Sequence, residues 1–131
     1  MLIKTSELKD RALDWAVAIA NNMKPIIHKI QCGSPGTPFK YKGYVAIPCS
    51  NGDCWTYEPT LKHELSGRIM DANFISTVWA PGLEEHEWRA ETPTDMNDQS
   101  ETGPTRVIAA LRCFVASKLG AEVEIPDELV E

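Results

Sequence analysis

Apolar residues recur at helical spacing near the N-terminus of the chain. The positions that carry this repeat are Leu8, Ala12, Trp15, Ala16 and Ile19. The pattern predicts a helix from about Ser6 to Ala20, capped by Thr5 or Ser6, with Pro25 preventing its continuation. The polar remainder of this helix is Lys9, Asp10, Arg11 and Asp14.

A second helical pattern begins at Gly103-Pro104-Thr105 and ends at Gly120. Proline is favoured in the first turn of a helix and glycine just past the end. The apolar positions cover more than one face, namely Val107, Ile108, Leu111, Phe114, Val115 and Leu119. We therefore expect this helix to be largely buried, with Cys113 as an inert packing residue.

Between the helices, turn-forming residues separate short runs of β-type sequence. Gln31–Lys42 reads as a loop, followed by the runs Tyr44–Ile47 and Trp55–Tyr57 on either side of Asn51-Gly52. Asn-Gly is the preferred pair of a type I′ hairpin turn, in which both residues take positive φ. Because proline disrupts a central strand, Pro48 indicates that this hairpin lies at a sheet edge.

Further along the chain, Ile69–Val78 reads as a longer strand. Glu87–Ala90 is its expected antiparallel partner across Ala80-Pro81-Gly82, and residues 91–103 read as an acidic loop. The pattern as a whole predicts an α+β fold in which two helices pack on one small antiparallel sheet. With no internal repeat and no linker, residues 1–131 are expected to form one domain.

Composition narrows the classes of protein to consider. Of the 131 residues, 43% are hydrophobic, enough for a core, but no apolar run approaches the length of a membrane span. Residues 1–83 carry nine Lys/Arg against seven Asp/Glu, whereas residues 84–131 carry four against twelve. No concentrated basic surface of a nucleic-acid binder is visible. The sequence also opens without a secretory signal, so we expect a cytoplasmic protein with reduced cysteines.

Two segments carry a family resemblance. The stretch from Gly103 to Gly120, with Glu122-Val123-Glu124-Ile125-Pro126 after it, resembles the C-terminal signature of NinX-like proteins of lambdoid and P22-type bacteriophages. Lys4-Thr5-Ser6-Glu7-Leu8 with Ala12–Ala18 resembles the N-terminal signature of the same family, and a weaker match runs through Tyr57, Pro59 and Gly67 to Ile75-Ser76. The resemblance implies a phage accessory protein active in the host cytoplasm, and it carries no catalytic residues.

Four residues are candidates for a zinc site. Cys49 and Cys54 are expected to face each other across the hairpin, and His28 and Cys32 lie upstream with i, i+4 spacing. Such a set could bind zinc tetrahedrally, but the Cys-x4-Cys spacing is not that of a zinc knuckle. We favour four reduced, metal-free thiols, and we predict no bound metal and no other cofactor.

Catalytic motifs do not appear in the sequence. There is no phosphate-binding Gly-x4-Gly-Lys loop, no Gly-x-Ser-x-Gly elbow and no His-Glu-x-x-His. His63-Glu64 and His86-Glu87 place an imidazole next to a carboxylate, but neighbouring residues of a strand point to opposite faces. Solvated surface side chains are the simpler interpretation, and binding is favoured over catalysis.

Aromatic and basic residues supply the groups that hold a nucleotide. Trp79 and Trp88 offer faces on which a base can stack, and Arg68 offers a guanidinium. Thr105 and Arg106 lie at the start of the second helix, where backbone N–H groups favour an anion. These five residues form the predicted ligand-binding set, although packing in the core is the more common role for any single tryptophan.

Three functions follow from these features. The first is non-enzymatic binding that sequesters a small nucleotide signal of host defence, with a pocket that a homo-oligomer interface could complete. The second is an inhibitor or adaptor of a host protein that uses the acidic C-terminal third. The third is a metal-dependent hydrolase, which requires a bound metal or a clustered carboxylate–histidine set.

Overall fold

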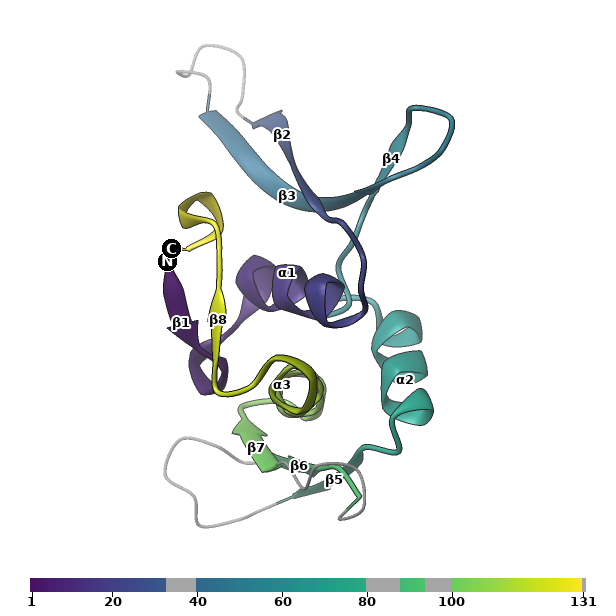
Figure 1. Ribbon diagram of the computed structural model, residues 1–131, viewed down its shortest axis with the longest axis vertical. Coiled ribbons are helices and arrows are strands. Elements are labelled where there is room, and N and C mark those ends of the chain that lie inside the picture. The colour runs from purple at the N-terminus through teal and green to yellow at the C-terminus, as the bar shows by residue number, and fades with distance from the viewer. Residues whose placement is uncertain (33–39, 80–87, 94–99, 131) are drawn as a thin grey trace.

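The computed structural model describes residues 1–32, 40–79, 88–93 and 100–130. In these segments three α-helices and two short 3-10 turns lie among three small antiparallel sheets (Figure 1). The helices are α1 (Asp10–Ala20), α2 (His63–Ala72) and α3 (Arg106–Leu119), and the turns are η1 (Thr5–Glu7) and η2 (Asp127–Leu129). The strands are β1 (Leu2–Lys4), β2 (Ile26–Cys32), β3 (Lys40–Pro48), β4 (Cys54–Thr56), β5 (Ser76–Trp79), β6 (Trp88–Glu91), β7 (Ser100–Gly103) and β8 (Glu122–Glu124).

The expected α+β class is confirmed, but its arrangement differs from two helices on one sheet. The sheets have the strand orders β1-β8, β2-β3-β4 and β5-β6-β7, and every pairing is antiparallel. Helix α3 lies at the centre, with α1 and α2 on two sides and the β5-β6-β7 sheet on a third (Figure 1). The helix that has apolar residues on more than one face thus occupies the central position, where other elements cover it on several sides.

Helix α3 has the ends and the burial that its sequence predicts. Thr105 is the N-cap, and its Oγ1 accepts a hydrogen bond of 3.1 Å from the Ile108 N–H. Pro104 lies just before this cap, not inside the first turn as expected. Gly120 follows the last turn with a φ of +93°, a conformation that favours glycine. The side chains of Leu111 and Phe114 are fully buried.

Arg112 ties α3 to two other parts of the fold. It lies in the buried stretch of the helix, where a guanidinium needs partners. Its Nε donates to the Leu8 carbonyl at 2.8 Å, and its Nη1 donates to the Thr102 carbonyl at 3.0 Å. A charged residue at this position therefore joins the N-terminal segment to strand β7.

The first helix begins later than predicted, at Asp10 instead of Ser6. Thr5 is fully buried in η1, where its N–H donates to Ala121 O and its Oγ1 to Gly120 O, both at 2.7 Å. Lys9 is the N-cap of α1 and makes no side-chain cap hydrogen bond. The predicted cap is wrong because the Thr5 side chain is hydrogen-bonded to Gly120 at the C-terminal end of α3, 115 residues away.

The predicted strand Ile69–Val78 is also wrong. Its first half is the last turn of α2, and only Ser76–Trp79 forms a strand, β5. Asn73 ends the helix with its Nδ2 donating to Ile69 O at 2.7 Å, and Phe74 follows with a φ of +53°. The predicted antiparallel pairing with the next strand is confirmed for β6, whereas Ala80-Pro81-Gly82 lies outside the described residues.

Strands occur in two segments that were predicted as loops. The end of β2 and the start of β3 occupy the two ends of Gln31–Lys42, and Ser100–Gly103 forms β7 beside β6. Both segments are poor in alternating apolar residues, so long-range pairing decides their conformation. Gly103 also allows α3 to pack closely, because a Cβ there would come within 2.8 Å of the Ala109 nitrogen.

The β3–β4 hairpin lies at a sheet edge as predicted, with β4 as the edge strand. Pro48 pairs with Cys54 beyond the end of β2, so its missing N–H breaks no bond between β2 and β3. The type I′ turn is wrong, because Gly52 has a φ of +90° whereas Asn51 does not have a positive φ. The Gly52 N–H instead donates to Cys49 O at 3.2 Å, closing a four-residue turn.

Candidate functional site

The N-terminus of α3 opens into a hollow of about 460 Å³ beside α2. The lining residues are His63, Ser66, Gly67 and Met70 from α2, with Thr105, Arg106 and Val107 from the start of α3. The α2 residues recur at helical spacing and therefore share the face that packs towards α3. Two of the five predicted ligand-binding residues, Thr105 and Arg106, thus lie together in one concave site.

The electrostatics of this hollow favour an anion. The N-terminus of a helix carries a partial positive charge, and Arg106 adds a full one at an exposed position. The first turn of α3 holds no acidic residue, whereas α1 has Asp10 and α2 has Glu64 in theirs. None of the described residues that line the hollow is acidic. A phosphate or carboxylate is the group that this lining fits best.

The two predicted tryptophans lie at the same end of the β5-β6-β7 sheet as the start of α3. Trp79 pairs with Trp88, and Trp88 pairs with Gly103, two residues before the cap of α3. The two rings meet edge to face, with centroids 5.4 Å apart. Trp79 is half exposed and Trp88 is partly buried against the core. Neither ring lines the hollow itself.

The fifth predicted residue, Arg68, lies on the exposed side of α2. Its Nη2 is 2.6 Å from Oε1 of Glu64, one helical turn earlier, and it does not line the hollow. Nη2 of Arg89, a further arginine of the β5-β6-β7 sheet, lies 2.5 Å from Oε1 of Glu91. His63 and Glu64 are neighbours on a helix rather than on a strand, and Glu64 is engaged with Arg68. His86-Glu87 lies outside the described residues.

Sequence reasoning missed a second hollow, of about 400 Å³, around Asp14. Its lining residues are Asp10, Arg11, Asp14, Tyr44, Glu58, Thr60 and Leu61. Asp14 is only 2% exposed, although it is one of the polar positions of the helix. Its Oδ1 accepts from the Thr60 N–H at 2.9 Å and its Oδ2 accepts from Thr60 Oγ1 at 3.0 Å.

Burial raises the pKa of Asp14 from 3.8 to about 7. The two hydrogen bonds from Thr60 act in the opposite direction, and repulsion from Glu58 and Asp10 adds to the increase. The one sequence signal for this site is a carboxylate between Leu13 and Trp15 in a strongly apolar helix. A perturbed carboxyl in a hollow is a feature of many functional sites and also of structural networks.

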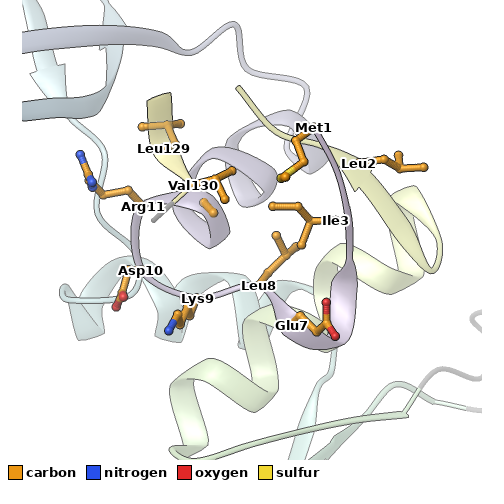
Figure 2. A pocket seen from close by; sticks show the side chains of 11 residues that line it. Met1, Leu2, Ile3, Glu7, Leu8, Lys9, Asp10, Arg11, Leu129 and Val130 are labelled. Carbon is orange, nitrogen blue, oxygen red and sulfur yellow. The ribbon is translucent and has the colours of Figure 1, made fainter. Parts of the chain in front are cut away.

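A third hollow, of about 380 Å³, lies where the two ends of the chain meet. Figure 2 shows the side chains of Met1, Ile3, Leu8 and Val130 gathered around it. Its charged lining residues have both signs, namely Glu7, Lys9, Asp10 and Arg11. The lining is mostly apolar and selects for no particular charge.

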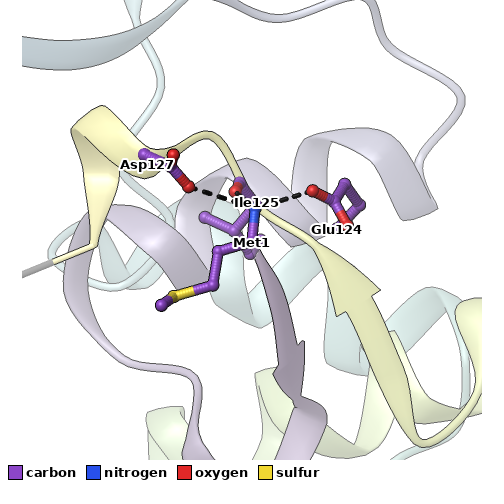
Figure 3. A network of polar contacts seen from close by, with 4 residues as sticks. All are labelled: Met1, Glu124, Ile125 and Asp127. Carbon is purple, nitrogen blue, oxygen red and sulfur yellow. Dashed lines mark hydrogen bonds and ion pairs between the residues drawn. The ribbon is translucent and has the colours of Figure 1, made fainter.

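The amino group of Met1 binds the N-terminus to the end of β8 and to the segment after it. It lies 2.6 Å from Oε1 of Glu124, 2.8 Å from the Ile125 carbonyl and 3.2 Å from Oδ1 of Asp127 (Figure 3). The hydrogen bond to Glu124 is the main cause that raises the pKa of this ammonium group. These contacts hold β1 against β8 and position the wall of the third hollow.

The zinc candidates do not converge as the sequence suggests. Cys54 pairs with Pro48, whereas Cys49 lies beyond the end of β3 and bonds through its N–H to Asp53 O. His28 does reach Cys54, with Nδ1 at 3.4 Å from Sγ. Within the described segments, no three His, Cys, Asp or Glu residues lie close enough to hold a metal ion. The side chain of Cys32 lies outside the described part of the chain.

We expect the purified protein to contain its four cysteines as metal-free thiols. Zinc needs about four ligands in tetrahedral geometry, and the described residues offer only the pair His28 and Cys54. Elemental analysis of protein prepared without added metal, combined with titration of free thiols, measures both quantities. Zinc near one equivalent per chain would contradict the prediction and make the hairpin a metal-dependent folding element.

Comparison with known protein families identifies the origin of the chain. A family model described as Bacteriophage P22, NinX matches residues 4–118. The chain belongs to this phage protein family. The match extends from β1 to the end of α3 and so contains the α2–α3 hollow and the Asp14 hollow. No curated protein matches this NinX-family chain. Among its described helices, none has the length and apolar character that crossing a membrane requires.

Proposed function

We propose that this NinX-family protein is a phage accessory protein that binds a small phosphate-bearing ligand in the hollow between α2 and α3. The observation that carries this proposal is Arg106 at a helix N-terminus, beside a hollow with no acidic lining residue among those described. A volume of about 460 Å³ is within the range of small-molecule sites. The ligand we infer is a nucleotide of host defence signalling, and the action is sequestration in the host cytoplasm.

Groups in and near the hollow suit the phosphate and the base of a nucleotide. Arg106 and the first-turn N–H groups of α3 suit the phosphate, since charge-assisted hydrogen bonds are the strongest available. His63 adds polar atoms on the α2 wall, where the Ser66 hydroxyl donates to the His63 carbonyl at 3.2 Å. Trp79 is the aromatic candidate for stacking, because it is half exposed at the end of the sheet where α3 begins. Hydrogen-bond donors and a cation are better suited to binding a ligand than to catalysing its conversion.

Replacing Arg106 by alanine is expected to weaken a phosphate-bearing ligand by about 1.5–3 kcal/mol, because one charge-assisted hydrogen bond is lost. The fold should remain intact, since Arg106 is exposed. Isothermal titration calorimetry against a panel of cyclic and linear nucleotides measures the affinity of each protein. Circular dichroism confirms that the variant is folded.

Arg68→Ala is the matched control. Arg68 also carries an exposed guanidinium on the α2 side of the fold, but it pairs with Glu64 and does not line the hollow. We expect its affinity to equal that of the native protein. Equal losses in both variants would point to a general charge effect. Absence of binding by the native protein to every nucleotide in the panel would end the proposal.

A second function, binding to a host protein, is favoured by large apolar side chains exposed near the end of α2. Phe74 is 68% exposed directly after α2, and Val78 on the adjoining strand is about half exposed. Large apolar side chains that remain exposed are common in protein-binding surfaces. If the nucleotide panel gives no binding, replacing Phe74 and Val78 by serine and measuring capture of a host protein becomes the deciding experiment.

A further inference from the structure

A thiol and an imidazole from two separate strands meet on the surface of the β2-β3-β4 sheet. Sγ of Cys54 on β4 lies 3.4 Å from Nδ1 of His28 on β2, and 26 positions separate them in sequence. β2 and β4 pair with opposite edges of β3, so only the folded sheet brings these side chains together. His28 is exposed and Cys54 is partly exposed, which leaves the sulfur accessible.

The chemistry of this pair is that of an assisted nucleophile. A thiol reacts through its sulfur only as the proton leaves, and a neighbouring base promotes that step. When the imidazole carries its hydrogen on Nε2, the lone pair of Nδ1 faces the S–H group and can accept the proton. The distance of 3.4 Å is short enough for this transfer without movement of either strand.

The other described thiols lack this arrangement. Cys49 is more exposed than Cys54, but no contact between its thiol and an imidazole is found among the described residues, whereas Cys54 has one. Cys113 is fully buried in α3, where burial raises the pKa of its thiol to about 11. A comparison of these three thiols therefore distinguishes the effect of exposure on reactivity from the effect of a neighbouring base.

We propose that Cys54 is a thiol-modification site assisted by His28, at which a low-molecular-weight disulfide is attacked. The Cys54 proton passes to Nδ1 of His28 as Sγ bonds to one sulfur of the disulfide. The S–S bond of the reagent breaks, and its second sulfur leaves with the electron pair and takes up a proton. One thiol and one disulfide thus yield one mixed disulfide and one small thiol. The site is independent of the α2–α3 hollow.

The test compares Cys54 with Cys49 inside one protein. The full chain is treated with 2-hydroxyethyl disulfide, an uncharged reagent, so the charge of nearby Asp53 does not bias the comparison. Mass spectrometry of the digested protein follows the mixed disulfide at each cysteine over time. We expect Cys54 to react at least about tenfold faster than Cys49, although Cys49 is the more exposed thiol. Cys113 should remain unmodified.

The variant His28→Gln tests whether the imidazole itself raises the reaction rate at Cys54. Glutamine keeps a polar side chain at an exposed position but offers no basic nitrogen, so the rate at Cys54 should fall to about that of Cys49. The rate at Cys49 should not change, and continued protection of Cys113 shows that the variant is folded. Equal rates at Cys54 and Cys49 in the native protein would refute the proposal without any variant. An unchanged Cys54 rate in folded His28→Gln would also refute it.

Discussion

Replacing Phe114 by alanine is expected to lower the free energy of unfolding by about 3–5 kcal/mol. Phe114 is 1% exposed and belongs to the stretch of α3 that α1, α2 and the β5-β6-β7 sheet surround. Truncation removes the transfer free energy of the ring and leaves a cavity that neighbours on several sides cannot all fill. Urea denaturation of the native and variant proteins measures the difference.

Lys118→Ala is the control for this substitution. Lys118 is exposed in the last turn of the same helix, so its loss tests helix propensity and surface charge without touching the core. We expect a change within about 0.5 kcal/mol, the range of ordinary surface substitutions. A Phe114→Ala protein as stable as Lys118→Ala would contradict the central position of α3.

Replacing Asp14 by asparagine is expected to remove a pH dependence of stability. The pKa of Asp14 rises from the ordinary aspartate value of 3.8 to about 7 on folding, so between these values the folded state binds more protons than the unfolded state. The contribution of Asp14 to stability is therefore fully present below about pH 4 and is lost as the pH rises towards 7. Between pH 5 and pH 8 the loss amounts to about 3 kcal/mol.

The measurement is urea denaturation of native protein and Asp14→Asn at a series of pH values. The difference between the two proteins isolates this group from other titrations, and it should shift in favour of the variant between pH 5 and pH 8. Asparagine is nearly isosteric and can still accept a hydrogen bond from Thr60. Asp71→Asn, at an exposed carboxylate outside the hollow, should follow the native curve. Parallel curves for Asp14→Asn and the native protein would refute a raised pKa.

The candidate sites depend on long-range contacts to different degrees. Thr105 and Arg106 are identifiable from the sequence because a helix start is a local feature, and the cap and the backbone N–H groups follow from adjacent residues. The wall of the hollow that His63 and Ser66 contribute cannot be identified from the sequence. The reason is that the apolar pattern over the last turn of α2 also suits a strand. The Asp14 hollow escapes sequence reasoning for a similar reason, since Thr60 comes from a turn 46 residues away.

The sequence by itself determined α3 and the family. Apolar residues on several faces, a threonine cap and a terminal glycine are local signals that specify a buried helix, and the same stretch carries the NinX signature. Only the tertiary structure decided that Thr5 bonds to the end of α3, that Asp14 is buried and that His28 meets Cys54. Each of these depends on which distant backbone or side chain lies opposite. That choice follows from packing of the whole chain, and no local pattern of apolar and polar residues encodes it.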